Sequence, residues 1–186
     1  MATAVEVTAA LKTAARSAED ALDGVEDALA DRDALDDALD TATQEARNAL
    51  AGRSLRAVDE APYTLLFPQG IAYYTAAPLN AQTQRYGELR ERAAQHLPVD
   101  DAVRSALLPA LDQGLAGWRE AVSALDAARA SASLASSALD QATDAWTRQM
   151  ERTYGALVTE LGKVAARRFF PRTRKAQEMP EPTPDP

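Results

Sequence analysis

The sequence predicts an all-α protein, an elongated antiparallel hairpin or coiled-coil-like bundle of two long helices with shorter capping helices. The 186 residues include 42 Ala, whereas β-branched and aromatic side chains, which favour strands, are scarce. Apolar residues recur every three or four positions in two long segments, which is the spacing of a helix that packs along one face. Proline interrupts the chain between these segments, so the two long helices are expected to run in opposite directions.

The first long helix is predicted over residues 3–60. Thr3 and Glu6 have the spacing of a capping box, in which each side chain accepts a hydrogen bond from the backbone N–H of the other residue. Because no proline precedes Pro62, the helix is expected to continue to the end of this range. Its apolar stripe, interrupted at Arg32, consists of Ala4, Val7, Leu11, Ala14, Ala18, Ala21, Val25, Ala28, Leu35, Leu39, Ala42, Ala46 and Ala49.

An uncharged connection follows at residues 62–80. It contains three prolines and four of the ten aromatic residues, namely Tyr63, Phe67, Tyr73 and Tyr74. Since such side chains are stabilised by burial, we expect an ordered, non-helical connection rather than a disordered linker. A short helix is predicted next, over residues 81–97, with Asn80 as its N-cap.

The second long segment, residues 100–169, is also predicted to be helical, with Asp100 as its N-cap. Two features indicate a heptad pattern here. Tryptophan, leucine and alanine alternate in one row, and a row of small residues runs beside it. The triplet Ala-Leu-Asp recurs every two heptads, at 110–112, 124–126 and 138–140.

The serine-rich residues 131–137 resemble a turn between two helices. A turn would normally shift the phase of the apolar row, and the phase continues unchanged through this stretch. We therefore favour one helix from about Pro109 to Phe169. The alternative is a break near 130–134, which would fold the chain into a compact four-helix bundle.

Residues 1–170 are expected to form a single helical domain. Residues 171–186 are rich in proline and poor in core-forming side chains, so they are predicted to be a disordered tail. No stretch combines the basic start and apolar core of a signal peptide, and none has the uninterrupted apolar run of a membrane helix. A cytoplasmic location is therefore expected.

The composition argues against several activities. With 28 acidic and 20 basic residues, the formal net charge is −8, so nucleic acid is not expected as a partner. The chain has no Cys and one His, which removes thiolate metal sites, a Cys nucleophile and multi-histidine metal sites. It also lacks a phosphate-binding loop, a dinucleotide-binding motif and a nucleophile elbow. We therefore expect no enzyme activity, cofactor or metal, and we assign no residue to these roles.

Two groups of residues are predicted to bind a protein partner. The first belongs to the aromatic connection and combines apolar area with polar hydroxyl groups: Tyr63, Phe67, Tyr73 and Tyr74. The alternative is that this connection plugs the open end of the hairpin core, with the tyrosine hydroxyls at its rim and three apolar residues inside: Leu65, Phe67 and Ile71.

The second group lies near the C-terminus and combines arginine with phenylalanine: Arg167, Arg168, Phe169, Phe170, Arg172 and Arg174. Arginine beside exposed aromatic rings can dock on acidic proteins or on anionic lipid. The alternative is that the cations complement the dipole at a helix C-terminus while the two rings close the end of the core.

Acidic residues crowd the first long helix between Glu19 and Asp40. Carboxylates three and four positions apart share a helix face, which could attract a cation or a basic partner. Such a run is more commonly a solvated outer face, and that is our interpretation here.

Together these features predict a non-enzymatic helical scaffold or protein–protein interaction module. Self-association into a homo-oligomer is expected, because a thin Ala-rich hairpin buries little apolar area by itself. One alternative is a peripheral membrane-binding protein that uses the Arg/Phe C-terminal segment, although a membrane is not the favoured partner. Another is a small-molecule or cofactor-binding helical bundle, which requires the compact four-helix arrangement.

Overall fold

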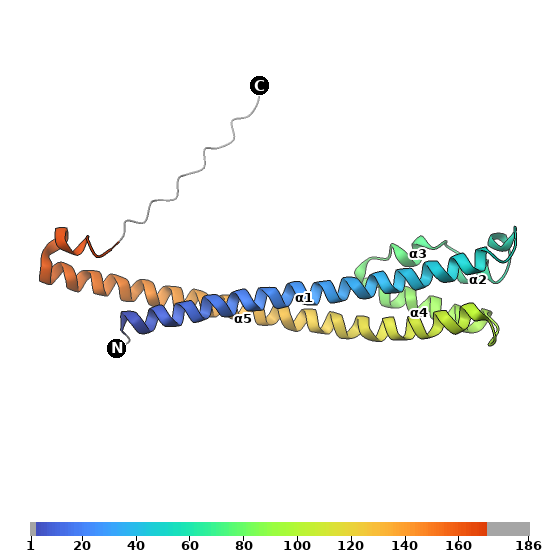
Figure 1. Ribbon diagram of the computed structural model, residues 1–186, viewed down its shortest axis with the longest axis horizontal. Coiled ribbons are helices and arrows are strands. Elements are labelled where there is room, and N and C mark those ends of the chain that lie inside the picture. Colours follow the sequence, from blue (N-terminus) through green and yellow to red (C-terminus); the bar gives the residue numbers. More distant parts are fainter. Residues whose placement is uncertain (1–2, 171–186) are drawn as a thin grey trace, which may run out of the picture. The chain divides into compact units, whose positions relative to one another are not determined.

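A computed structural model describes residues 3–170, which contain helices, turns and no strand (Figure 1). The predicted all-α class is therefore confirmed. The chain divides into two compact units. Unit 2 is Ala18–Ala135, and unit 1 consists of the described parts of Met1–Ser17 and Ser136–Pro186.

The first long helix, α1, spans Ala4–Ala51. The predicted capping box is present: the backbone N–H of Thr3 donates to Glu6 Oε2 at 2.6 Å, and that of Glu6 donates to Thr3 Oγ1 at 3.3 Å. The prediction that this helix reaches residue 60 is wrong. Gly52 is a poor helix former, and Ser54 Oγ accepts a hydrogen bond from the Arg56 backbone N–H at 3.3 Å, so local turns replace the helix.

The connection between the long helices is more helical than predicted. It contains three short pieces, η1 (Ala57–Asp59), α2 (Tyr63–Leu66) and α3 (Ala72–Thr75). Each is about one turn long because Pro and Gly, which are unfavourable in a helix interior, follow closely. The short helix α4 spans Leu79–His96, so it begins two residues earlier than predicted, and Pro78 rather than Asn80 is at its N-cap.

The second long helix, α5, spans Ala102–Ala166 and passes through Pro109. Its cap is Asp101 and not the predicted Asp100, since Asp101 Oδ1 accepts the Val103 backbone N–H at 2.8 Å. The helix continues through residues 130–134, so the alternative with a break at that point is wrong. The prediction of one helix as far as Phe169 is wrong at its end: α5 is interrupted at Gly162, where φ is 78° and ψ is 158°, a conformation that favours glycine, and it ends at Ala166.

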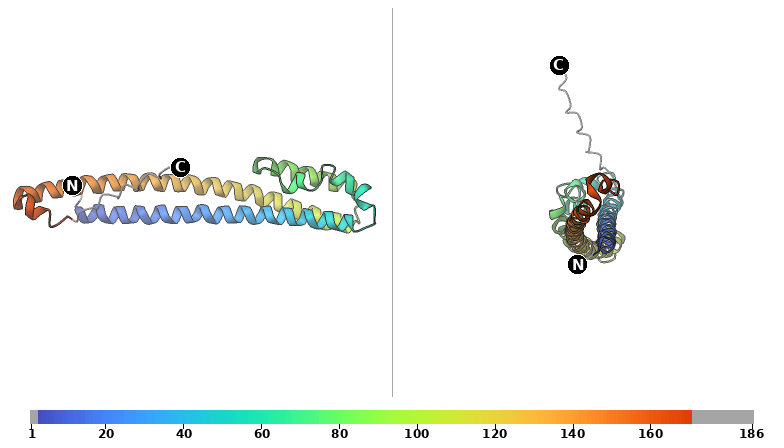
Figure 2. Two further views of the ribbon diagram at one scale, coloured as in Figure 1. Left: turned by 90° about the horizontal axis from the view of Figure 1, so that it is seen from above. Right: turned by 90° about the vertical axis from the view of Figure 1, so that its left-hand side faces the viewer.

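Unit 2 has a continuous apolar core. Within it, α1 and α5 run antiparallel, because Leu39 faces Gly114 while Leu35 faces Gly117. Figures 1 and 2 both show α4 alongside these segments, and α2 and α3 complete the core. The core residues are Leu39, Ala46, Leu50, Leu66, Phe67, Tyr74, Tyr86, Leu89, Ala93, Leu97, Val103, Leu107, Leu111 and Leu115.

Unit 1 pairs the start of α1 with the second half of α5, and its interior is much thinner. The indole Nε1 of Trp146 donates to Thr8 Oγ1 at 3.1 Å, which links the two helices. Predicted seam residues such as Leu11 and Trp146 are only half-buried, and among the described residues of this unit Ala166 alone is fully buried. Throughout residues 3–170, no helix is both long enough and apolar enough to cross a membrane.

Candidate interaction surfaces

The four residues predicted in the aromatic connection come together in one cluster. The rings of Tyr63 and Phe67 lie 5.4 Å apart, and those of Phe67 and Tyr74 lie 5.9 Å apart in an edge-to-face arrangement. The Tyr73 ring meets the Tyr74 ring edge-to-face at 5.1 Å. Such arrangements place the positive edge of one ring against the negative face of the next, so the cluster is itself a packed unit.

Half of this cluster belongs to the core and is not available to a partner. Phe67 is 4% exposed and Tyr74 is 1% exposed. The Tyr74 hydroxyl donates to the Leu66 carbonyl at 2.8 Å, and burial raises the pKa of Tyr74 to about 12. The plug alternative is therefore correct for Phe67, but Leu65 is 41% exposed and the Tyr74 hydroxyl lies inside rather than at the rim.

The other two aromatic residues are half-buried, and their hydroxyls are bound within the protein. The Tyr73 hydroxyl donates to Glu88 Oε2 at 2.8 Å, a hydrogen bond that raises the pKa of Tyr73. The Arg85 guanidinium lies 4.5 Å from the centre of the Tyr73 ring and donates to the Tyr73 carbonyl at 2.6 Å. Tyr63 accepts a 3.3 Å hydrogen bond from Arg47 Nε. These contacts hold α3 and α4 together and tie α2 to α1.

Two residues of the acidic run anchor α4, and the sequence analysis did not predict this role. Asp36 Oδ1 accepts a 2.5 Å hydrogen bond from Gln82 Nε2, and Asp40 accepts one from the Tyr86 hydroxyl. Burial, followed by the nearby charge of Asp40, raises the pKa of Asp36; burial also raises the pKa of Tyr86. The sequence feature that could have indicated this anchor was Gln82, a polar residue that lies four positions before Tyr86 on the apolar face of α4.

The rest of the acidic run agrees with the predicted solvated face. The exposed members are Glu19, Asp20, Asp23, Glu26, Asp27, Asp31, Asp33 and Asp37. Arg32, which interrupts the apolar stripe, is half-buried and pairs with its neighbour Asp33 at 2.5 Å. Within residues 3–170, no cluster of His, Cys, Asp and Glu is arranged to hold a metal ion.

The predicted C-terminal group follows the interruption of α5 at Gly162. Arg167 and Arg168 are exposed, and Phe169 is 65% exposed. Phe170 instead packs edge-to-face against Tyr154, with ring centres 5.2 Å apart. The predicted residues Arg172 and Arg174 lie outside the described residues.

Other exposed side chains extend this group into one surface. Val164 is 78% exposed and Leu161 is half exposed, and Lys163 is exposed between them. We call this surface the C-terminal segment: Leu161, Lys163, Val164, Arg167, Arg168 and Phe169. It joins three apolar and three cationic side chains.

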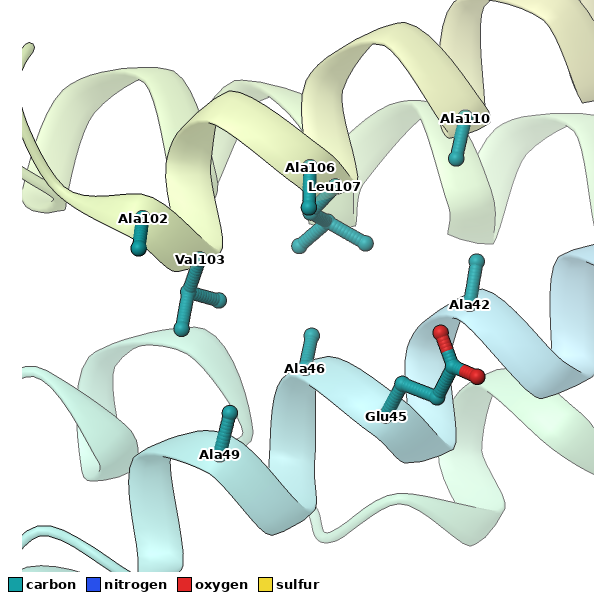
Figure 3. Close-up of a pocket in the computed structure, with 9 residues that line it drawn as sticks. All are labelled: Ala42, Glu45, Ala46, Ala49, Ala102, Val103, Ala106, Leu107 and Ala110. Carbon is teal, nitrogen blue, oxygen red and sulfur yellow. The ribbon is translucent and has the colours of Figure 1, made fainter.

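Unit 2 also carries a hollow of about 230 Å³ between α1 and α5 (Figure 3). We call it the alanine groove. All its lining residues come from these two helices, whereas α4 covers the face of α1 that bears Asp36 and Asp40. The lining consists of Ala42, Glu45, Ala46, Ala49, Ala102, Val103, Ala106, Leu107 and Ala110.

A second hollow, of about 500 Å³, continues the same face of α1 and α5. Its α1 residues Ala28, Asp31 and Leu35 belong to the row that reaches Ala42 and Glu45 in steps of three and four. The charged residues that line the two hollows are Asp31, Glu45 and Glu120, and all are exposed and acidic. This face therefore combines an apolar floor with a negative rim.

No protein-family model matches the chain, and neither a curated protein nor a solved structure is significantly similar to it.

Proposed function

We propose that this chain is a non-enzymatic helical scaffold or protein–protein interaction module that self-associates into a homo-oligomer. The observation that carries the proposal is the incomplete burial of the apolar seam in unit 1. Its seam residues Leu11, Trp146 and Leu157 are half-buried, and Ala166 is the fully buried residue among those described there.

Two helices alone cannot enclose a continuous apolar stripe, because each helix is covered by its neighbour on one side only. The remaining apolar area stays in contact with water, and each 100 Å² that a partner removes from water contributes about 2.5 kcal/mol. In unit 2, α2, α3 and α4 pack on the part of the hairpin between Leu39 and Leu115 and cover it. In the described residues of unit 1, such cover is limited to the end of the chain, where Phe170 packs on Tyr154 and Ala166 is buried, so helices from another molecule are the natural complement for the rest of the seam.

Binding to a membrane surface is the second candidate function. The observation in its favour is the C-terminal segment, whose exposed apolar side chains stand among cations, as in proteins that bind anionic bilayers. The net charge of −8 opposes it, because the molecule as a whole is repelled by anionic lipid. The small-molecule alternative required the break near 130–134, which α5 lacks, so we do not extend it.

Sedimentation equilibrium of the full chain tests the proposal. The expected result is a mass above the 19.9 kDa of one chain, with an average that rises with protein concentration. Helicity measured over the same concentrations should rise too, because association covers the seam of unit 1. A single-chain mass at every concentration, with constant helicity, would contradict self-association. The cytoplasmic location belongs to the same proposal, and fractionation of cells that express the protein tests it.

A further inference from the structure

We propose that the alanine groove of one copy receives the C-terminal segment of a second copy. This inference rests on the proposed self-association and names the two surfaces that meet. The groove lies in unit 2 and the segment lies in unit 1, so the contact joins two different surfaces of the same protein.

The alanine groove and the C-terminal segment are complementary in their apolar surfaces. The floor of the groove is formed by buried Ala46, Val103 and Leu107, while Ala49, Ala102 and Ala106 on its walls are exposed. Because alanine side chains are short, another backbone can approach α1 and α5 closely here. The C-terminal segment supplies large side chains that lack cover, Leu161, Val164 and Phe169. Burial of these side chains against the groove removes apolar area of both copies from water.

The two surfaces also carry opposite charges. Unit 2 holds twenty acidic and ten basic residues, whereas the rest of the chain holds eight acidic and ten basic residues. Glu45 is the charged residue that lines the alanine groove, Asp31 and Glu120 line the second hollow on the same face, and no basic residue lines either hollow. Lys163, Arg167 and Arg168 surround the apolar side chains of the segment. Opposite charges at the rim orient such a contact and speed association.

The same charges favour a second copy over a membrane as the occupant. An anionic bilayer attracts the basic C-terminal segment but repels the strongly acidic unit 2. In a contact between two copies, the acidic charge of unit 2 instead attracts the segment. A contact between two different surfaces repeats from copy to copy, so it produces a ring where the rotation closes and an open chain where it does not. Two copies can also exchange the contact reciprocally, so the inference predicts a dimer or a larger oligomer.

A charge-swap experiment on the full chain tests the contact. Variant X carries Glu45→Arg and Asp31→Arg, which reverses the charge at the rim of the alanine groove and at one rim residue of the second hollow. Variant Y carries Arg167→Glu and Arg168→Glu, which makes the segment acidic. The matched control carries Glu19→Arg and Asp37→Arg, two exposed α1 residues outside both hollows. Sedimentation equilibrium at low and high salt gives the association constant of each protein and of mixtures.

X and Y should each associate at least about tenfold more weakly than the parent, because like charges then face each other across the contact. An equal mixture of X and Y should recover association, since the basic segment of X meets the acidic groove of Y and the acidic segment of Y meets the basic groove of X. The control should associate like the parent, and high salt should weaken the parent.

Three outcomes would overturn the inference. If X and Y associate as strongly as the parent, other surfaces carry self-association, and the proposed function stands without this contact. If the mixture does not recover association, the two surfaces do not meet. If the parent has the mass of one chain but binds phosphatidylcholine–phosphatidylserine vesicles and Y does not, the segment binds membranes and self-association fails as well.

Discussion

Gly114 in α5 packs directly against Leu39 of α1, and Gly114→Ala tests that packing. A Cβ atom at this position would lie 2.9 Å from Leu39 Cγ and closer still to Leu39 Cδ2. Leu39 is fully buried in the core and has little room to move. At Gly24 in α1, by contrast, an added Cβ atom would meet nothing within 4 Å.

Both substitutions improve helix propensity, but they differ in the packing around the new methyl group. In a helix interior, replacement of Gly by Ala stabilises by about 1 kcal/mol through helix propensity. At Gly114 the new methyl group also overpacks the core, which costs about 1–3 kcal/mol. Gly24→Ala should therefore raise the free energy of unfolding by about 1 kcal/mol. Gly114→Ala should leave it unchanged or lower it by up to about 2 kcal/mol, the difference between these two effects.

Urea unfolding followed by tryptophan fluorescence measures both changes. The chain has two tryptophans, and Trp146→Phe leaves Trp118, a buried residue of unit 2, as the reporter. Gly24 and Gly114 also lie in unit 2, so one transition reports on both. In a Leu39→Ala background the clash disappears, and Gly114→Ala should then be stabilising.

The reasoning would be refuted if Gly114→Ala and Gly24→Ala stabilised the protein equally. It would also fail if the Leu39→Ala background left the effect of Gly114→Ala unchanged. Either result would mean that α1 and α5 are not in close contact at Leu39 and Gly114.

Three further predictions concern the polar contacts that hold unit 2 together. Asp101→Ala removes the cap of α5 and the 2.6 Å ion pair with Arg53, so unfolding in urea at neutral pH should require about 1–2 kcal/mol less. The Arg53 hydrogen bond lowers the pKa of Asp101. The stabilisation from ionised Asp101 is therefore complete above the ordinary pKa of 3.8 and is lost as the pH falls through the lowered pKa. The unfolding free energies of the parent and the variant should converge in strong acid. Tyr86→Phe removes the hydrogen bond to Asp40 and should cost about 1–3 kcal/mol by the same assay, and an unchanged value would show that the bond to the carboxylate adds nothing. Burial raises the pKa of Tyr74 to about 12 against an ordinary 10.0, so the free energy of unfolding should fall as the pH rises between these values. Ultraviolet titration of the folded protein should show Tyr74 ionising after the more exposed tyrosines. If Tyr74 ionised together with them, its burial would be contradicted.

The parts of the fold that the sequence predicted are those determined by local periodicity. The stripe along the first long helix keeps one phase, and every member except Ala49 is at least half-buried. Thr3 and Glu6 form the expected capping box because both partners are three residues apart in the same turn. Continuity of α5 through residues 130–134 also followed from phase, since a change of direction would have shifted the row.

The predictions that failed depended on contacts between distant residues. The connection forms short helices because Phe67 and Tyr74 enter a core that also contains Leu50 and Leu89, and isolated turns of this length are not stable by themselves. The candidate site residues also have different roles because contacts with distant residues decide which of them are buried. Phe67 and Tyr74 are core residues while Phe169 is exposed, although all three are large aromatic residues.

By itself, then, the sequence determined the helical class, the faces of the long helices and the continuity of α5 through residues 130–134, because these depend on interactions within about one turn. Tertiary structure alone decided which polar side chains became structural. Asp36 and Asp40 are chemically equivalent to the exposed acids around them, and they differ because α4 covers them with Gln82 and Tyr86. Only the folded chain brings together side chains that lie 46 residues apart in the sequence. The same packing decides which helix faces stay exposed to a partner.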